Sequence, residues 1–180
     1  AEVLEVASQI TPGDNESFHQ AWATMGNSVF DLAEDFAKNG NDISARRTYL
    51  RAFNYLRTSE FFLVPNDERK LPSYLKCREA FIKAVERFEH KPLQVEIPFE
   101  GSFLPGYLFA PAGVKNPPLM IMFGGLDSLA EELYFGISQH LNERGIALLA
   151  MDGPGQGASL RLNHIHTRYD FNVAGTAVLD

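Results

Sequence analysis

Two glycine-containing segments bring together the residue types best suited to chemistry. The first runs from Phe123 to Ser128 with the sequence FGGLDS, and the second runs from Asp152 to Gly157 with the sequence DGPGQG. Glycine lets the backbone approach a ligand closely, and the free N–H groups at a helix start attract negative charge. Such a segment could hold an oxyanion, although glycines also serve simply to make a tight turn between a strand and a helix.

Other uses of the same segments fit less well. A phosphate-binding loop requires the spacing G-x-G-x-x-G or a Lys–Ser/Thr pair, and the segment that starts at Asp152 has neither. Asp152 could be a catalytic carboxylate, but an Asp before Gly more commonly accepts hydrogen bonds from amides of its own loop, so we expect that structural role. The pair His164 and His166 lacks a companion cluster of Cys, Asp or Glu, and we therefore expect no metal site and no cofactor.

Composition narrows the class of protein. The 180 residues include 16 Lys and Arg against 23 Asp and Glu, and the net charge of −7 has the wrong sign for a surface that follows phosphates, so we expect no nucleic-acid partner. No run of about 18 apolar residues occurs, which predicts no membrane-spanning helix. No secretory signal is visible, and the single cysteine, Cys77, cannot form an internal disulfide. We therefore expect a cytoplasmic location.

The elements that must position the two glycine segments lie in residues 92–180. Alternating apolar and polar residues in Leu93–Phe99, followed by a turn and by residues 101–111, predict an antiparallel hairpin. The continuous apolar runs Leu119–Phe123 and Ile146–Met151 predict two adjacent, buried, parallel strands. With a helix between them, these strands form a βαβ unit. The expected fold class is therefore α/β with a mostly parallel sheet.

The helix between the two parallel strands is expected to begin with a capping box formed by Ser128 and Glu131 and to end at Gly145. In open α/β sheets, ligands bind beyond the carboxyl ends of the strands, and both glycine segments emerge there. The sequence thus places its candidate chemistry at the ligand-binding edge of the sheet.

Residues 1–91 are expected to form a helical region. Helical periodicity predicts a first helix that begins with a capping box of Ser17 and Gln20, a second helix that Asp42 caps, and a third helix over about 72–88. The residues of the first helix that are expected to face a core are all large and apolar: Phe18, Trp22, Met25, Val29, Leu32 and Phe36.

The two glycine segments and the elements beside them resemble a known family. Gly124–Ser128, the helix with Glu131 and Glu132, and Arg144–Gly157 (RGIALLAMDGPGQG) are similar to the α/β-hydrolases of the FrsA-like esterase group. That group includes 2,6-dihydroxypseudooxynicotine hydrolase and the fungal polyketide chain-shortening hydrolases. The resemblance covers residues 93–180 well, and the helical region resembles the N-terminal helices that these enzymes place over the active site. It implies a Ser–His–Asp triad that hydrolyses an ester or a carbon–carbon bond next to a carbonyl through an acyl-enzyme.

One motif of these hydrolases is missing from the sequence. The nucleophile elbow, G-x-S-x-G, should follow the next strand, but the segments around Ser138 and Ser159 lack its closing glycine and its strand–turn–helix context. The chain reaches Asp180 inside an expected helix that begins near Asp170. We therefore expect an N-terminal part of such a hydrolase, with residues 92–180 stopping before the elbow and the Ser, Asp and His of the triad beyond Asp180.

The resemblance also implies roles for residues of this chain. The backbone N–H of Leu126 would be a donor of the oxyanion hole, Gly125 would permit the close approach, and Asp127 could support the catalytic histidine or merely stabilise the loop. The helical region would be a lid, with Phe18 and Trp22 as candidate walls of the substrate pocket. Many such lids also dimerise, which leaves a homodimer open.

The expected substrate is a small acyl or ketone compound, and the expected partner is the C-terminal half of the hydrolase. Two other interpretations use the same residues. An acyltransferase or a Dieckmann-type cyclase would replace water by another nucleophile. A non-catalytic helical interaction module would need no nucleophile. The residues present leave these alternatives open.

Overall fold

The computed structural model describes residues 1–180 and divides them into two compact units, 1–89 and 90–180. The sequence places this boundary between residues 91 and 92. Each unit has its own layers and its own buried residues.

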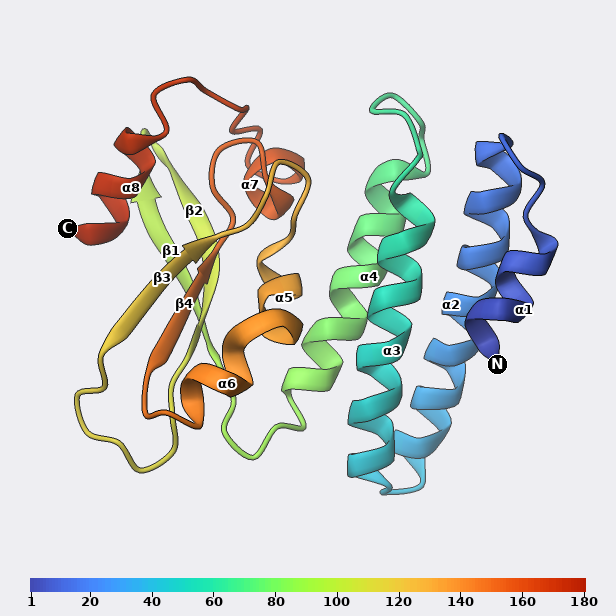
Figure 1. Cartoon of the computed structure of the whole chain (residues 1–180), viewed down its shortest axis with the longest axis horizontal. Helices are drawn as coiled ribbons and strands as arrows, with labels where there is room; N and C mark the ends of the chain where they lie inside the picture. The colour runs from blue at the N-terminus through green and yellow to red at the C-terminus, as the bar shows by residue number, and fades with distance from the viewer. The chain divides into compact units, whose positions relative to one another are not determined.

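The first unit is entirely helical. It contains α1 (Glu2–Gln9), α2 (Asn15–Lys38), α3 (Asp42–Glu60) and α4 (Lys70–Val85). Helices α2, α3 and α4 run side by side with α3 in the middle, and α1 packs along α2 (Figure 1). The predicted helices are confirmed as elements, whereas α1 is an element that the sequence pattern did not reveal.

The start of α2 differs from the prediction. Asp14 is the N-cap, and its Oδ1 accepts a hydrogen bond from the amide of Glu16 at 2.9 Å. The Ser17 hydroxyl instead contacts the backbone of the preceding segment, and Gln20 donates to the Glu16 carboxylate. The predicted capping box of Ser17 and Gln20 is therefore wrong. Similarly, α3 starts at Asp42 itself, so Asp42 does not cap it.

The buried face of α2 is only partly the predicted one, since it includes Val29. Leu32 is 42% exposed, whereas small residues lie on the buried side of the helix. Gly26 shows why: a Cβ at this position would lie 2.8 Å from Cγ of Leu56 on α3. Small side chains therefore let α2 approach α3 closely, and a pattern of large apolar residues does not detect such an interface. The buried residues of α2 are His19, Ala21, Gly26, Val29, Phe30 and Ala33.

The second unit is built on a four-stranded sheet. Its strands are β1 (Leu93–Phe99), β2 (Ser102–Phe109), β3 (Leu119–Phe123) and β4 (Ala147–Met151), in the order β1-β2-β4-β3. The predicted hairpin and the predicted parallel pair β3–β4 are both confirmed. The predicted burial is right for β4 but wrong for β3, because β3 is an edge strand and its Leu119 and Met120 are exposed. Because β2 pairs antiparallel with β4, the sheet in this part of the chain is mixed, with one parallel pairing at its edge.

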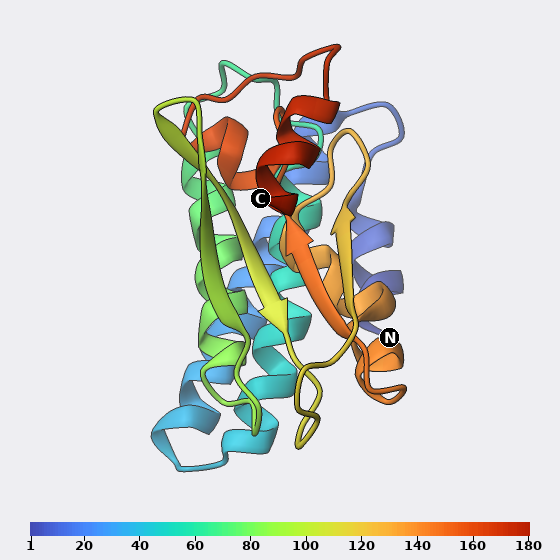
Figure 2. The ribbon, with the colours of Figure 1, turned by 90° about the vertical axis from the view of Figure 1, so that its left-hand side faces the viewer.

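Helices cover both faces of this sheet. On one face lies a continuous helical run of α5 (Ala130–Leu133), the π-helical turn η1 (Tyr134–Ser138) and α6 (Gln139–Asn142). On the other face, α8 (Asn172–Leu179) packs through Ala174 against Leu149 and Met151. Figure 2 shows α8 on the viewer's side of the sheet and the α5–α6 run behind it. The short helix α7 (Gly157–Arg161) follows the second glycine segment.

Candidate oxyanion-binding site

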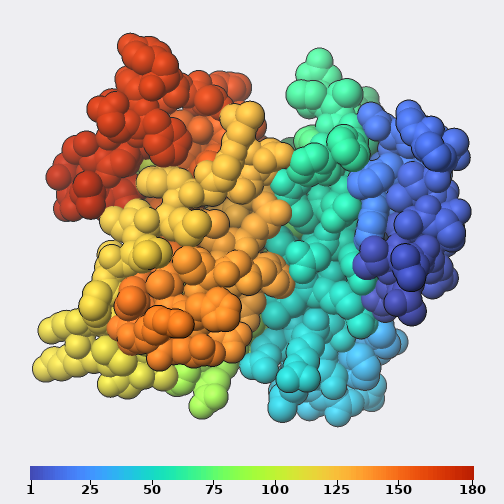
Figure 3. Space-filling model, in the orientation of Figure 1, coloured from blue at the N-terminus to red at the C-terminus, as the bar shows by residue number.

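Both glycine segments lie at the carboxyl ends of the parallel strands. β3 runs into the loop that begins at Gly124, and its parallel neighbour β4 runs into the loop that begins at Asp152. Parallel strands end at the same edge, which brings the two loops together. The segment between β3 and α5 protrudes at the surface in Figure 3, where it is light orange. The predicted position of both segments is confirmed.

The contact between the two loops is made by one side chain, Gln156. Its Nε2 donates to the carbonyl oxygens of Gly124 at 2.6 Å and of Gly125 at 2.7 Å. Its Oε1 accepts from the amide of Gly153 at 2.9 Å. Gln156 is only 6% exposed; its bond to Gly153 is buried, and its two bonds to the glycine carbonyls are partly buried. The sequence reasoning gave Gln156 no role, because a polar residue between glycines is also typical of an exposed turn.

The Leu126 amide is a free donor in the first loop. It makes no hydrogen bond, and the Leu126 side chain is 76% exposed. The neighbouring amide of Gly125 is occupied, because it donates to Oγ of Ser128 at 3.1 Å. In a trans peptide the N–H points opposite to the carbonyl, so with the Gly125 carbonyl on Gln156, the Leu126 N–H points away from Gln156. An N–H held in this way can bind a negatively charged oxygen.

The helix after this loop starts one residue later than predicted. Ser128 caps nothing, since its Oγ receives the Gly125 amide within the loop. The amide of Leu129, the N-cap of α5, donates to the Glu132 carboxylate at 2.7 Å. Glu131 is buried instead, and its Oε1 accepts from the Tyr107 hydroxyl at 2.9 Å. The predicted capping box of Ser128 and Glu131 is therefore wrong, whereas the predicted left-handed Gly145 is confirmed, with φ of 73°.

Asp152 ties the starts of two helices together. Its Oδ1 accepts from the amide of Ala130 in α5, and its Oδ2 accepts from the amide of Ala158 in α7, both at 2.8 Å. The expected structural role of Asp152 is confirmed and extended, since one of its two partners lies outside its own loop. Burial, and next the negative charge of Glu131, raise the pKa of Asp152 to about 7.

Two serines that could have been nucleophiles are not placed as such. Ser159 is fully buried, and its hydroxyl donates to the Asp152 carbonyl at 2.6 Å. Ser138 is buried in the π-helical turn.

Asp127 lies in the exposed part of the first loop, and its support of a catalytic histidine stays a prediction. The structure brings no three His, Cys, Asp or Glu side chains together in a way that could hold a metal ion.

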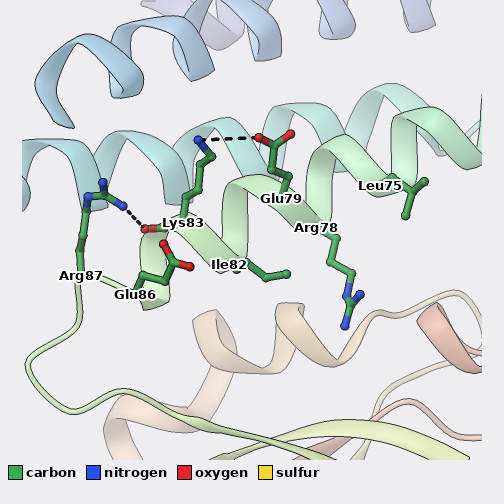
Figure 4. Close-up of a pocket in the computed structure, with 7 residues that line it drawn as sticks. All are labelled: Leu75, Arg78, Glu79, Ile82, Lys83, Glu86 and Arg87. Atoms are coloured by element: carbon green, nitrogen blue, oxygen red, sulfur yellow. Dashed lines mark hydrogen bonds and ion pairs between the residues drawn. The ribbon is translucent and has the colours of Figure 1, made fainter. Parts of the chain in front are cut away.

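The helical unit carries two hollows. One, of about 380 Å³, lies beside His19 among α2, α3 and α4, and His19 itself bonds through Nδ1 to the Ser59 carbonyl at 2.8 Å. The other, of about 400 Å³, follows α4, where Figure 4 shows Ile82 and Arg78 on the side opposite the Lys83–Glu79 pair.

Neither hollow is lined by the two predicted pocket residues. The Phe18 ring packs against Phe62 at 4.9 Å between centroids, and Trp22 packs against Tyr55 at 5.4 Å. The role of Phe18 and Trp22 as walls of a substrate pocket therefore stays a prediction. None of the helices is long and apolar enough to cross a membrane.

Comparison with curated proteins finds a group of fungal hydrolases. The chain is 38% identical to a hydrolase of Fusarium sp over 99% of its own length and 44% of that protein. It is 37% identical to the 20-hydroxy-prefusarin hydrolase of Gibberella moniliformis, again over 99% of the chain and 44% of the relative. The chain thus spans less than half the length of the curated relatives it matches.

Solved structures agree with this grouping. The crystal structure of 2,6-dihydroxy-pseudo-oxynicotine hydrolase superposes with a TM-score of 0.82 at 25% identity, over 99% of this chain and 49% of that one. The fold is accordingly that of the α/β-hydrolases. The family model described as "Esterase FrsA-like" matches residues 14–169. The resemblance inferred from the sequence is confirmed, and the chain belongs to the FrsA-like esterase family.

Proposed function

We propose that this protein is a serine hydrolase that cleaves an ester, or a carbon–carbon bond next to a carbonyl, through an acyl-enzyme. The observation that carries the proposal is the free Leu126 amide on a loop whose neighbouring carbonyls are held by Gln156. Hydrolysis of a carbonyl compound creates a negatively charged oxygen, and a fixed N–H at that point stabilises it. One such donor contributes about 2.7–4 kcal/mol to the transition state.

The remaining parts of the machinery come from residues outside this chain in our proposal. The relatives are more than twice as long as the part matched here, which leaves room for a Ser, an Asp and a His. The sheet also has room for further strands, because β3 lies at its edge with Leu119 and Met120 exposed. The second oxyanion donor would be the amide after the nucleophilic serine.

The substrate class follows from the same chemistry. We propose a small acyl or ketone compound. The names of two similar proteins support this, because each name states a small molecule as the substrate. Phe18 and Trp22 are the candidate side chains of the helical unit for the substrate pocket, and Asp127 is the candidate support of the histidine. A cytoplasmic location and a homodimer belong to this proposal as well.

The proposal is tested by removing the single N–H group. In the full-length protein, Leu126→Pro deletes the donor, and we expect kcat for an activated ester to fall by about 10²- to 10³-fold. Leu126→Ala is the matched variant, because it shortens the same exposed side chain but keeps the N–H, and it should lose far less. Both variants should still be labelled by a fluorophosphonate at one serine outside the present residues. Equal rates in the two variants, or labelling of Ser138 or Ser159, would contradict the proposal.

A further inference from the structure

We propose that Gln156 is a positioning residue of the oxyanion site: its carboxamide clamps the carbonyls of Gly124 and Gly125 and so fixes the direction of the Leu126 N–H. This inference rests on the proposed function, because it assigns a task to the loop on which that function depends. It adds a residue from the second glycine segment to a site that the sequence placed in the first segment alone.

The clamp uses the full hydrogen-bonding capacity of the side-chain amide nitrogen. The two hydrogens on Nε2 meet two carbonyl oxygens, at 2.6 Å and 2.7 Å, while Oε1 meets the Gly153 amide at 2.9 Å. These partners also fix which way the carboxamide faces. An N–H requires an oxygen opposite it and a carbonyl requires an N–H, so the reversed orientation would turn all three bonds into repulsions.

The loop needs such a clamp because of its own composition. Two consecutive glycines, Gly124 and Gly125, can adopt many backbone conformations. Within the loop Ser128 bonds to Gly125 alone: its Oγ accepts from the Gly125 amide at 3.1 Å, and its own amide donates to the Gly125 carbonyl at 3.2 Å. An oxyanion donor acts only when it lies about 2.7–3.1 Å from the developing charge. Holding both carbonyls on one side restrains both peptide planes, and the Leu126 N–H is left pointing to the other side.

The anchor of the clamp is itself rigid. Gln156 directly precedes α7, and the amide of Ala158 in the first turn of that helix donates to the buried Asp152. Gly153, which holds the other end of the carboxamide, lies two residues after the end of the buried strand β4. The segment that follows β4 therefore holds the Leu126 amide in place through Gln156, in addition to the bonds within the exposed loop.

The test replaces the donor while keeping the shape. In the full-length enzyme, Gln156→Glu preserves an acceptor for the Gly153 amide but turns an oxygen toward the two carbonyls. We expect kcat to fall about 10- to 100-fold, less than for loss of the donor itself, with KM changed by less than about 3-fold. Affinity for a boronic acid that forms a tetrahedral adduct should fall in parallel with kcat, since only the adduct carries the negative oxygen. Hydrogen exchange in residues 124–128 should become faster.

The matched control is Gln94→Glu, the same chemical change at an exposed position of β1. If Gln156→Glu and Gln94→Glu have equal kcat and equal boronic-acid affinity, the clamp has no catalytic task and the inference is overturned while the proposed function stands. If the wild-type enzyme neither hydrolyses the ester nor takes up fluorophosphonate, the proposed function fails and the inference fails with it.

A second variant covers loss of folding. Gln156→Met keeps nearly the same length without introducing a charge, and the same fall in kcat at nearly constant KM is expected. Circular dichroism that matches the wild type shows that the fold is intact. If both Gln156 variants are unfolded while Gln94→Glu is folded, Gln156 is needed for folding and the positioning role is overturned.

Discussion

The helical unit and the sheet unit differ in the groups that surround their buried acidic side chains. In the helical unit Glu60 is fully buried, and two cations meet it: Arg57 at 2.9 Å and Lys70 at 3.0 Å. In the sheet unit Asp152 is equally inaccessible, but its hydrogen bonds come from two backbone amides, and the acidic Glu131 lies near enough to raise its pKa. Burying a carboxylate costs free energy unless its charge is compensated. Cations compensate the charge of Glu60, whereas backbone amides compensate only part of the cost for Asp152.

The charges around Glu60 stabilise the packing of helices, whereas the hydrogen bonds of Asp152 hold the segments around the candidate site. Arg57 and Glu60 are neighbours on one helix, and Lys70 begins the next, so their network stabilises helix packing. Asp152 instead fixes the starts of the two helices that follow the two glycine segments. The sheet unit thus has a buried acid with a raised pKa next to the candidate oxyanion loop, and perturbed pKa values of this kind are common at functional sites.

The largest effect is expected when Asp152 is replaced. Asp152→Ala removes two caps, each worth about 0.5–2 kcal/mol, and leaves a buried space, so we expect a loss of about 2–4 kcal/mol of unfolding free energy. Hydrogen exchange should become faster at the starts of α5 and α7, while fluorescence of Trp22, the single tryptophan, reports on the helical unit. Asp31→Ala, at an exposed helix position, is the control. An unchanged exchange rate in α5 would break the proposed division of tasks.

The sequence predicted the elements of the sheet unit well because its patterns are local. An alternating run, two continuous apolar runs and a turn define β1 to β4. The parallel pairing of β3 and β4 follows from these apolar runs, although β3, at the edge of the sheet, is only partly buried. The position of the two glycine segments follows in turn, since carboxyl ends of parallel strands share an edge.

The errors came from features that local spacing does not determine. Ser17 with Gln20, and Ser128 with Glu131, have the spacing of a capping box, yet Asp14 and Glu132 do the capping. The buried face of α2 depends on Gly26, whose contact partner lies thirty residues away on α3.

The role of Gln156 was missed for the same reason. Its three partners lie in two loops, two of them more than thirty residues before it in the chain. Only the folded chain brings them together. Had a buried environment been assumed for the second glycine segment, its one carboxamide would have required such partners, which is the signal that could have found it.

A second effect, of intermediate size, is a dependence of stability on pH that belongs to the sheet unit. The pKa of Asp152 is about 7 in the fold and near its ordinary value of 3.8 when unfolded. The folded protein therefore binds more protons between these values, and the unfolding free energy falls as pH rises from about 4 to about 7, by at most about 1.4 kcal/mol per pH unit. The carboxylates of Glu16 and Asp170, whose pKa values are lowered by arginines, act below this window.

Chemical unfolding at a series of pH values between 5 and 8 measures this dependence. In Asp152→Asn the group cannot titrate, so the slope in this window should disappear even though the variant is less stable at every pH. A slope that persists in the variant would assign the dependence to other groups and remove the contrast between the two units.

The smallest effect is expected at the surface of the helical unit. Arg69 donates to Glu16 at 2.8 Å and to Asp67 at 2.7 Å, and the side chain of Arg69 is 44% exposed. These bonds hold the pKa of Glu16 near 2 and the pKa of Asp67 well below its usual range. Exposed ion pairs contribute little to stability because water and salt screen them. Arg69→Gln should therefore leave the melting temperature almost unchanged while the pKa of Glu16 returns toward 4.5, its ordinary value.

Carboxyl carbon chemical shifts followed by NMR during an acid titration give both pKa values directly. Arg47→Gln removes an exposed arginine elsewhere in the same unit and should leave Glu16 and Asp67 unchanged. Since a lowered acid pKa stabilises the fold above that pKa, any loss in the variant should disappear below about pH 2 and approach its full size above about pH 4.5. A large loss of stability at pH 7 would mean that surface pairing stabilises the helical unit as strongly as buried pairing, and the contrast with Asp152 would then be one of location only.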